Sequence, residues 1–231
     1  MRAVLKLSGE ALAGDDKHGI NHEVARSVAE QIKQLVERGH QIGIVIGGGN
    51  FWRGCTNDEI DRAYSDNLGM MATMMNSNYM AAVCQELGVK AQIYAPFSCG
   101  PFGNIFSISE ARQKLSEGTV VFFEGGTGQP YFSTDTGVVV NALKVKADAI
   151  LLAKAVDGVY DSDPKHNPDA KKFDEISIDD VIKHNLGVMD MSAVFMARDN
   201  KMPLLVFGLK GENSILNAID GQFVGTKVTV G

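Results

Sequence analysis

Short apolar runs that end in glycine-rich loops recur along the chain, and segments with helical spacing of apolar residues separate them. The runs at 3–7, 41–46, 119–123 and 149–153 are aliphatic or β-branched, and the second and third lead into GGGN and GGTG. Continuous apolar strands that alternate with helices are typical of a mainly parallel sheet covered on both faces. We therefore expect an α/β fold, a three-layer sandwich with a mainly parallel central sheet.

Signals for helix ends support this alternation. Asn21 is placed to cap the first long helix and Gly39 to end it, and Gly88 is placed to end the next. The polar segment 161–172, with two prolines, is expected at the surface after a turn at 156–160. The expected helices lie near residues 24–36, 68–87, 108–115, 138–145, 178–184, 190–200 and 214–219, and further strands near 90–94, 204–207 and 226–230.

Composition and charge exclude several classes of function. Of 231 residues, 22 are Lys or Arg and 28 are Asp or Glu, a formal net charge of -6, and no run of basic residues offers the stripe that nucleic acids require. No apolar run approaches the roughly 20 residues of a membrane span, and the N-terminal one is too short for a signal sequence. We expect a single domain over 1–231 in the cytoplasm, with neither nucleic acid nor membrane as partner.

Cysteines and histidines suggest no redox or metal site. Cys55, Cys84 and Cys99 are odd in number and widely spaced, which fits neither a disulfide framework nor a CxxC site. The five histidines show no HExxH motif. We interpret the cysteines as small apolar residues and the histidines as solvated or locally bonded.

Two loops at predicted strand ends carry groups suited to phosphate. Lys6 ends the first strand beside a predicted Ser8-Gly9 turn, where its ammonium and nearby backbone N–H groups could bind phosphate oxygens; the alternative is a solvated lysine. The second strand ends in glycines 47–49, whose missing Cβ atoms let backbone amides approach an anion. Arg53 adds a planar guanidinium group, which is suited to binding phosphate. The alternative for the glycines is a tight turn between strand and helix.

A third loop has the sequence GGTGQPYFSTD over residues 125–135. Tyr131 and Phe132 could stack on a base, the amide and hydroxyl groups could bind its edge, and the following helix N-terminus could take a phosphate. Asp135 falls in the first turn of that helix. It is either a helix-capping carboxylate or an anion that orients a catalytic lysine.

Several catalytic motifs are absent from the sequence. No Gly-Lys pair occurs, which excludes a Walker A loop, and the HRD, DFG, GxGxxG and GxSxG motifs are also missing. A hydrolase with a nucleophile and a base is therefore unsupported. Loops that can cradle an anion, in contrast, occur three times.

Six segments across nearly the whole chain carry a resemblance to a known family. They are KLSGEAL, IGGGNFWRG, DNLGMMATMMN, GGTGQPYFSTD, VDGVYDSDP and VMDMSAVFMARDNKMPLLVF, in this order. Together they resemble the bacterial uridylate kinases (UMP kinases) of the amino acid kinase superfamily. The resemblance implies a single-domain α/β sandwich, phosphoryl transfer from Mg-ATP to UMP in pyrimidine nucleotide biosynthesis, and a homohexamer.

The resemblance also implies roles for individual residues. Catalytic positions match Lys6, Asp135, Lys154 and Asp190. ATP contacts match Lys6, Leu7, Ser8, Gly9, Gly49, Arg53, Tyr160 and Asp163. UMP contacts match Gly48, Asp66, Thr127, Gly128, Gln129, Pro130, Tyr131, Phe132, Ser133 and Thr134, with Asp66 placed to accept from the ribose hydroxyls.

One segment departs from the family pattern. Family members often carry a lysine directly before VDGV, or an extra residue there, whereas this chain has Lys154 followed by Ala155 and Val156. We assign the second phosphate-binding lysine to Lys154, allowing a shift of one residue in the loop. Asp190 is either a carboxylate that organises the phosphate site or the cap of the helix that begins there.

The implied chemistry needs positioning and charge neutralisation more than covalent catalysis. Lys6 and Lys154 would flank the γ-phosphoryl group, and Arg53 would support phosphate oxygens. No general base is needed because the phosphate of UMP is already ionised. Mg²⁺, the implied cofactor, would be held mainly by nucleotide phosphates and water, with no metal site built from the protein.

Two other functions and one structural question stay open. A kinase of the same superfamily that forms an acyl phosphate would need cationic side chains to bind its carboxylate or carbamate substrate. The loop at 125–135 has amide and hydroxyl groups instead. A nucleotide-binding storage or sensor oligomer would not need both Lys6 and Asp135. The four methionines within residues 70–75 either fill the core or form part of a subunit interface.

Overall fold

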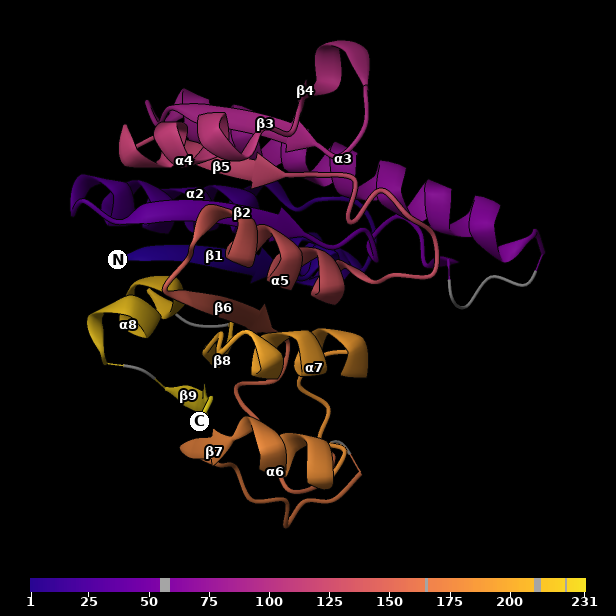
Figure 1. Ribbon diagram of the computed structural model, residues 1–231, viewed down its shortest axis with the longest axis vertical. Coiled ribbons are helices and arrows are strands. Elements are labelled where there is room, and N and C mark those ends of the chain that lie inside the picture. Colours follow the sequence, from indigo (N-terminus) through magenta and orange to yellow (C-terminus); the bar gives the residue numbers. More distant parts are fainter. Residues whose placement is uncertain (55–58, 165, 210–212, 223) are drawn as a thin grey trace.

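Buried strands form the centre of the molecule. The computed structural model describes residues 1–54, 59–164, 166–209, 213–222 and 224–231. In these residues nine strands make one sheet, in the order β4-β3-β5-β2-β1-β6-β8-β9-β7 (Figure 1). The strands are β1 (Arg2–Leu7), β2 (Gln41–Ile46), β3 (Ala91–Ala95), β4 (Asn104–Ile105), β5 (Val120–Phe123), β6 (Ala149–Lys154), β7 (Glu175–Ser177), β8 (Leu204–Gly208) and β9 (Gly225–Thr229).

Neighbouring strands are parallel from β4 through to β8. β1 pairs with β2 on one side and with β6 on the other, and β2 pairs with β5. At the far edge β9 is antiparallel to β8, and β7 pairs with β9 in parallel. The predicted mainly parallel α/β fold is confirmed.

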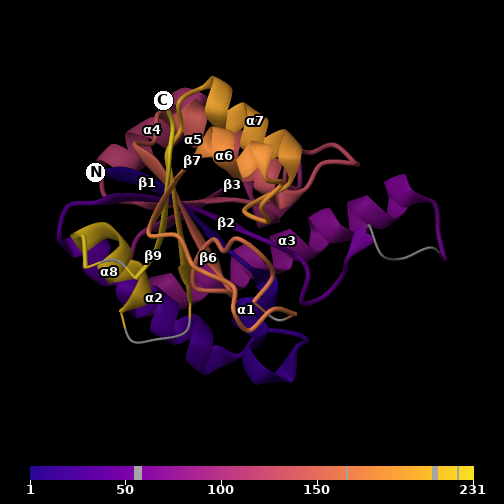
Figure 2. The ribbon, with the colours of Figure 1, turned by 90° about the horizontal axis from the view of Figure 1, so that it is seen from below.

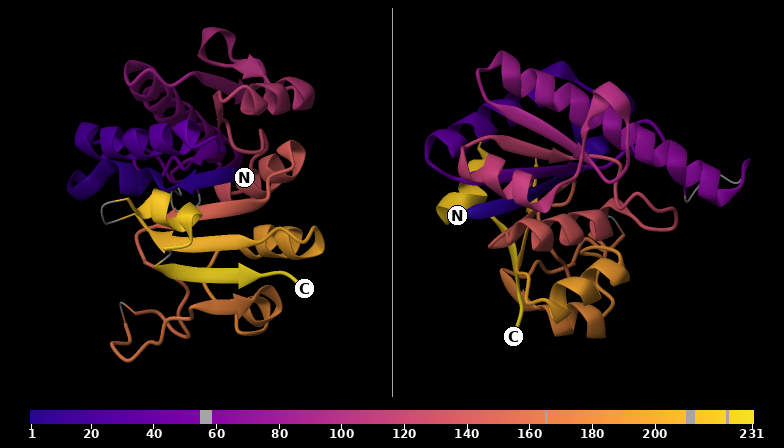
Figure 3. Two further views of the ribbon diagram at one scale, coloured as in Figure 1. Left: turned by 90° about the vertical axis from the view of Figure 1, so that its left-hand side faces the viewer. Right: turned by 45° about the horizontal axis from the view of Figure 1, so that its top comes forward.

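Two layers of helices cover the sheet (Figures 2 and 3). α2, α3 and α8 pack on the face that presents Leu5 and Phe122, and α4 to α7 pack on the face that presents Val4 and Val121. Adjacent residues of one strand thus enter different cores, because successive side chains point to opposite faces. The helices are α1 (Gly9–Ala13), α2 (His22–Glu37), α3 (Arg62–Glu86), α4 (Ile108–Ser116), α5 (Thr134–Val145), α6 (Ile178–Lys183), α7 (Met191–Asp199) and α8 (Ser214–Asp220).

The predicted ends of the two long helices are confirmed. The Asn21 side chain accepts hydrogen bonds from the backbone N–H groups of Glu23, at 3.0 Å, and Val24, at 3.1 Å. Gly39 and Gly88, just beyond α2 and α3, both have φ near +82°. Glycine adopts this left-handed conformation without a steric cost, so it ends a helix at such positions.

The interpretation of Ser8-Gly9 as a turn is wrong. Ser8 is the N-cap residue of α1, which begins at Gly9. A Cβ on Gly9 would lie 2.4 Å from the carbonyl oxygen of Gly47 and 2.3 Å from Oδ1 of Asn50. The start of α1 is therefore pressed against the second glycine loop, a tertiary contact that a local sequence pattern does not contain.

Other elements differ in extent from the prediction. The prediction lacks the short strands β4 and β7, because two or three residues are too few to show the alternation of a strand. Helix α3 begins at Arg62 and α5 at Thr134, earlier than expected. The turn at 156–160 leads into one antiparallel bridge between Tyr160 and Lys172.

Methionines 71 and 75 of α3 do not fill the core. The side chains of Met71 and Met75 are 59% and 50% exposed. In the first half of α3 the buried residues are small or polar, such as Ala72, whereas Met80 and Val83 are buried further along the helix. A Cβ on Gly48 would lie 2.8 Å from the Ala72 Cβ, so the helix approaches the glycine loop too closely for a long side chain at this point. The core interpretation is therefore wrong for these two methionines.

The cysteines carry no bridge in the described residues. Cys84 is buried and Cys99 is partly buried, both as free thiols, while Cys55 lies outside the described residues. Over the described ranges, no helix combines the length and the apolar character that a bilayer crossing demands.

Candidate active site

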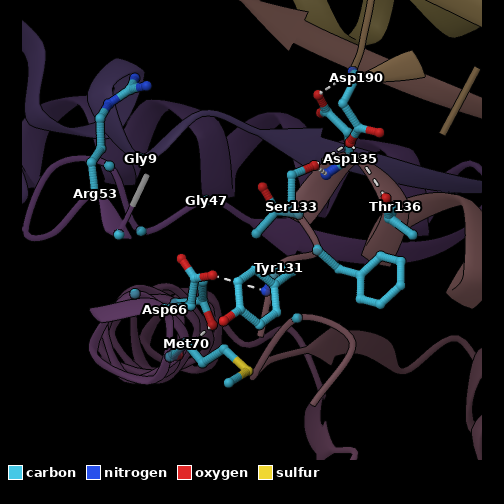
Figure 4. A pocket seen from close by; sticks show the side chains of 18 of the residues that line it. Gly9, Gly47, Arg53, Asp66, Met70, Tyr131, Ser133, Asp135, Thr136 and Asp190 are labelled. Carbon is cyan, nitrogen blue, oxygen red and sulfur yellow. Dashed lines mark hydrogen bonds between the residues drawn. The ribbon is translucent and has the colours of Figure 1, made fainter. Parts of the chain in front are cut away.

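A cleft lies where four adjacent parallel strands end. β5, β2, β1 and β6 are consecutive in the sheet, so the loops at their carboxyl ends meet at one edge. Ligands of open parallel sheets bind beyond these ends. The cleft has a volume of about 510 Å³, with Asp135 close to Asp190 and Asp66 close to Tyr131 (Figure 4).

Most residues predicted to contact nucleotide or phosphate line this cleft. They are Lys6, Ser8, Gly9, Gly48, Gly49, Arg53, Asp66, Gln129, Tyr131, Phe132, Ser133, Thr134, Asp135 and Asp190. The cleft therefore gathers residues from β1, the β2 loop, α3, the 125–134 loop and the start of α7.

Seven predicted residues lie outside the cleft lining: Leu7, Thr127, Gly128, Pro130, Lys154, Tyr160 and Asp163. The Leu7 side chain is fully buried, so only its backbone could meet a ligand. Thr127 lines a smaller cavity on the other side of its loop, of about 200 Å³. Gly128 and Pro130 line neither of these cavities.

Strand β1 and helix α5 bring two opposite charges together. Lys6 Nζ donates to Asp135 Oδ1 at 2.5 Å, and the two side chains are only 15% and 17% exposed. Burial acts to raise the pKa of Asp135, but the nearby charges of Lys6 and Lys154 and the N–H of Asp190 outweigh it, so the pKa lies below its usual value. Lys6 is thus held beside an ionised carboxylate and is not a solvated lysine.

Helix α5 is capped by a residue other than Asp135. Ser133 is the N-cap, and its Oγ accepts from the backbone N–H of Asp135 at 2.9 Å. The Asp135 carboxylate is therefore free of capping and accepts instead from Lys6 and, at 3.1 Å, from the backbone N–H of Asp190. Of the two interpretations of Asp135, the geometry matches the one in which it orients a lysine.

Asp190 caps the helix that begins beside it, while its role in organising the phosphate site stays a prediction. Its Oδ1 caps α7 by accepting from the N–H of Ala193 at 2.9 Å. Its Oδ2 accepts from the hydroxyls of Ser133 and Thr136, the latter at 3.4 Å. A helix cap thus also ties the start of α5 to the start of α7 at the cleft wall.

Lys154 lines a separate cavity of about 460 Å³, together with Tyr160 and Asp163. Its ammonium donates to the backbone oxygens of Gly187, at 3.3 Å, and Val188. Burial lowers the pKa of Lys154 most, and the positive charge of Lys6 adds to this, while Asp135 opposes it. The ammonium groups of Lys6 and Lys154 and the Asp135 carboxylate therefore interact electrostatically, with Lys6 and Asp135 in the lining of the cleft and Lys154 in the lining of the separate cavity.

Arg53 faces the glycine loop from an exposed position. Its guanidinium pairs with the Glu10 carboxylate of α1, with Nε 3.0 Å from Oε1, and the two side chains are about half exposed. Exposed ion pairs contribute little free energy. A phosphate could replace this carboxylate at small cost.

Asp66 of α3 ties the 125–134 loop to the helix. Its Oδ2 accepts from the backbone N–H of Tyr131 at 2.8 Å and from Arg62 Nε at the same distance. Tyr131 has φ near +69°, a conformation that an aromatic residue adopts only at a cost and that often marks a ligand site. The rings of Tyr131 and Phe132 are 66% and 55% exposed, and the Arg62 guanidinium lies over the Tyr131 ring at 5.8 Å from its centroid.

Comparisons with known proteins agree with this arrangement. Residues 1–208 match the model of the amino acid kinase family. The chain belongs to the amino acid kinase family. It is similar to a solved UMP kinase from Bacillus anthracis, with 35% identity and a TM-score of 0.94 over 99% of this chain and 95% of that one. It is also similar to a UMP kinase from Ureaplasma parvum, with 34% identity and a TM-score of 0.94 over 99% and 98% of the two chains.

The carboxylates of this amino acid kinase family member are engaged by protein donors. Among the residues that the structure describes, no group of three or more His, Cys, Asp or Glu side chains is arranged to hold a metal ion. The oxygens of Asp135 and Asp190 all accept from Lys6, hydroxyls or backbone N–H groups. Such a donor set fits a Mg²⁺ that takes most of its ligands from phosphates and water.

Arg62 and Thr136 line the cleft but are absent from the sequence prediction, and so is Glu10, which pairs with the cleft residue Arg53. Arg62 lies four residues before Asp66 on one helix, a spacing that favours an ion pair and could have identified it. Glu10 and Thr136 have no such signal, because their partners Arg53 and Asp190 are distant in sequence.

Proposed function

We propose that the chain is a UMP kinase, which transfers the γ-phosphoryl group of Mg-ATP to UMP and yields UDP and ADP. The observation that carries the proposal is the similarity, over 99% of this chain, to two solved UMP kinases. The electrostatic interaction of Lys154, which lines one cavity, with Lys6 and Asp135, which line the other, supports it, since phosphoryl transfer needs positive charge at the transferring group.

The acceptor would lie in the cleft. Gly48 and the segment 127–134 would surround UMP, with the exposed rings of Tyr131 and Phe132 beside the base. Asp66 would accept from the ribose hydroxyls, in exchange for one of its present bonds to Arg62 or Tyr131. The UMP phosphate would then point toward the Lys6 ammonium.

The ATP phosphates would extend from the cleft to the second cavity. Their contacts would come from Lys6, the backbone of Leu7, Ser8, Gly9, Gly49 and Arg53. The base and ribose would occupy the cavity of about 460 Å³ with Tyr160 and Asp163. Lys154 would meet the phosphates where the two cavities approach.

Catalysis would rest on charge neutralisation at the transferring group. Lys6 and Lys154 would flank the γ-phosphoryl group, and Asp135 would hold the Lys6 ammonium in place. The acceptor phosphate is already an anion, so no side chain has to remove a proton. Mg²⁺, bound mainly by the nucleotide, would add positive charge to the phosphates, and Asp135 or Asp190 would contact it at most through water.

An assay of ADP release tests the proposal against its alternatives. The wild-type chain is offered ATP and Mg²⁺ with UMP, CMP, acetylglutamate or aspartate in turn. We expect turnover with UMP. Turnover only with the amino acids would identify an acyl-phosphate-forming kinase, and nucleotide binding without ADP release would identify a storage or sensor protein.

We further propose that the chain works in the cytoplasm, in pyrimidine nucleotide biosynthesis, as a single domain that assembles into a homo-oligomer, a hexamer. An exposed apolar stripe on α3 supports the assembly. Its members are Tyr64, Leu68, Met71 and Met75, which are between 38% and 70% exposed. Their spacing of three and four residues aligns them on one side of the helix, and a patch of this kind is typical of an interface.

A further inference from the structure

A buried carboxylate lies directly behind the proposed acceptor loop. Glu124 follows β5 and precedes Gly125, and its side chain is only 1% exposed. Its Oε2 accepts from Asn78 Nδ2 at 2.8 Å, and its Oε1 lies 3.6 Å from Cys99 Sγ, which shares its single S–H between this carboxylate and the Gly103 carbonyl oxygen at 3.2 Å. A buried carboxylate without a cation partner is unfavourable, so its retention calls for a physical reason.

Glu124 connects three separate segments. Asn78 belongs to α3, and Cys99 belongs to the turn at 96–103. The backbone N–H of Glu124 donates to the Tyr94 carbonyl at 3.0 Å and so extends the pairing of β5 with β3. A Cβ on Gly103 would lie 2.6 Å from Glu124 Oε1, so the turn is in close contact with the carboxylate.

The same segments form the walls of the acceptor loop. The Gly125 N–H donates to Thr73 Oγ1 of α3 at 2.9 Å. On the other side, a Cβ on Gly125 would lie 2.9 Å from the Phe97 ring, and a Cβ on Gly128 would lie 2.9 Å from Pro96. The loop is thus confined between α3 and the 96–103 turn, and Glu124 is the side chain that bonds to both.

We propose that Glu124 is a positioning residue for the acceptor nucleotide, and that its ionised form, by bonding Asn78 and Cys99 together, fixes the loop at 125–134 for binding. This inference rests on the proposed function. Glu124 does not touch the cleft itself, so it would act on acceptor affinity and leave the ATP side unchanged.

The surroundings of Glu124 allow its charge to change near neutral pH. Burial raises the pKa of Glu124 to about 7, against the hydrogen bonds from Cys99 and Asn78. Tyr94 of β3 and Lys144 of α5 line the small cavity that it shares. An ionised carboxylate accepts from both partners, whereas a protonated one has a donor in place of one acceptor. Protonation would therefore loosen one wall of the loop.

The KM values for UMP and ATP, measured between pH 6 and 8, test the proposal. Glu124→Gln keeps the shape of the side chain but does not titrate. Between pH 8 and pH 6, we expect the KM for UMP to rise three- to tenfold more in the wild type than in this variant. The titration of UMP itself is common to both proteins and cancels. Glu124→Ala should raise the KM for UMP about tenfold at pH 8, with the KM for ATP changed less than twofold. The surface variant Glu117→Gln should match the wild type.

Hydrogen exchange of the 125–134 segment in the nucleotide-free protein separates this inference from the proposed function. At pH 8, Glu124→Ala and Asn78→Ala should each speed exchange of this segment at least threefold. Glu124→Gln, which like the protonated carboxyl has a donor in place of one acceptor, should lie between Glu124→Ala and the wild type. Faster exchange together with no UMP turnover in any protein would keep the positioning role and reject the UMP kinase. Equal pH dependence of the UMP KM in wild type and Glu124→Gln, or unchanged exchange in Glu124→Ala, would overturn the positioning role.

Discussion

The Nζ atom of Lys6 lies 2.5 Å from Oδ1 of Asp135, although the two residues are 129 positions apart in the chain. Strand β1 carries the ammonium and the first turn of α5 carries the carboxylate. The contact holds a cation at the carboxyl edge of the sheet, in the lining of the cleft. The predictions below begin from this pair.

Replacing Lys6 by Ala should lower kcat for UMP phosphorylation by about two to four orders of magnitude, because preorganised charge at the transferring group is lost. The far-ultraviolet circular dichroism spectrum should remain that of the wild type. Lys183→Ala, on the exposed side of α6, is the matched control. Near-normal turnover of the Lys6 variant would reject its assigned role.

Replacing Asp135 by Asn should remove the charge that orients Lys6 and lower kcat more than the KM for either nucleotide. The pKa of Asp135 is held below its usual value, so its ionised form stabilises the fold above the unfolded pKa, and this stabilisation is lost as the pH falls through the folded pKa. Urea unfolding should therefore show the variant less stable than the wild type at pH 7, with the difference shrinking toward pH 3.5. A constant difference across this range would contradict the ion-pair assignment.

Replacing Glu124 by Gln should make the protein more resistant to unfolding at alkaline pH. A folded pKa raised from 4.5 to about 7 means that the wild type loses roughly 3 kcal/mol of unfolding free energy as the pH rises from below 4.5 to above 7. The Gln variant has no such titration and should lose less over the same range. Denaturant unfolding at pH 5 and pH 8 checks this, and parallel losses in both proteins would show that burial does not shift this carboxyl.

Replacing Lys154 by Met should weaken ATP use with little loss of stability. Burial already disfavours the charged form of this side chain and lowers its pKa, so an apolar replacement of similar length should be tolerated. We expect the kcat/KM for ATP to fall at least a hundredfold while binding of UMP alone, followed by calorimetry, changes less than threefold. Unaltered ATP kinetics would move the second phosphate-binding role to another residue.

Replacing Met71 and Met75 together by Glu should reduce the oligomeric state, because the two side chains are exposed and belong to the apolar stripe on α3. Light scattering after size exclusion measures the mass directly. Glu86→Gln, near the other end of α3, serves as the control. An unchanged mass for the double variant would exclude this stripe as an interface.

Much of the fold is encoded locally. The apolar runs gave β1, β2, β5 and β6 nearly at their observed bounds, and the caps at Asn21 and Gly39 follow from side-chain chemistry and glycine's freedom at positive φ. The start of α1 at Gly9 is different, because it depends on the close approach of the β2 loop. Likewise, the pattern of α3 suggested an apolar inner face, but close contact with the glycine loop selects a small residue at Ala72, whereas Met80 is buried further along the helix.

The sequence by itself determined the kinds of residue available at each strand end, because parallel strands separated by helices deliver all their carboxyl-terminal loops to one edge. Only the tertiary structure decided the pairings: Lys6 with Asp135, Arg53 with Glu10, and Glu124 with Asn78 and Cys99. Each of these contacts joins segments remote in the chain. Their geometry depends on the order of the strands in the sheet and on how closely α3 packs against the sheet. A local sequence pattern determines neither of these.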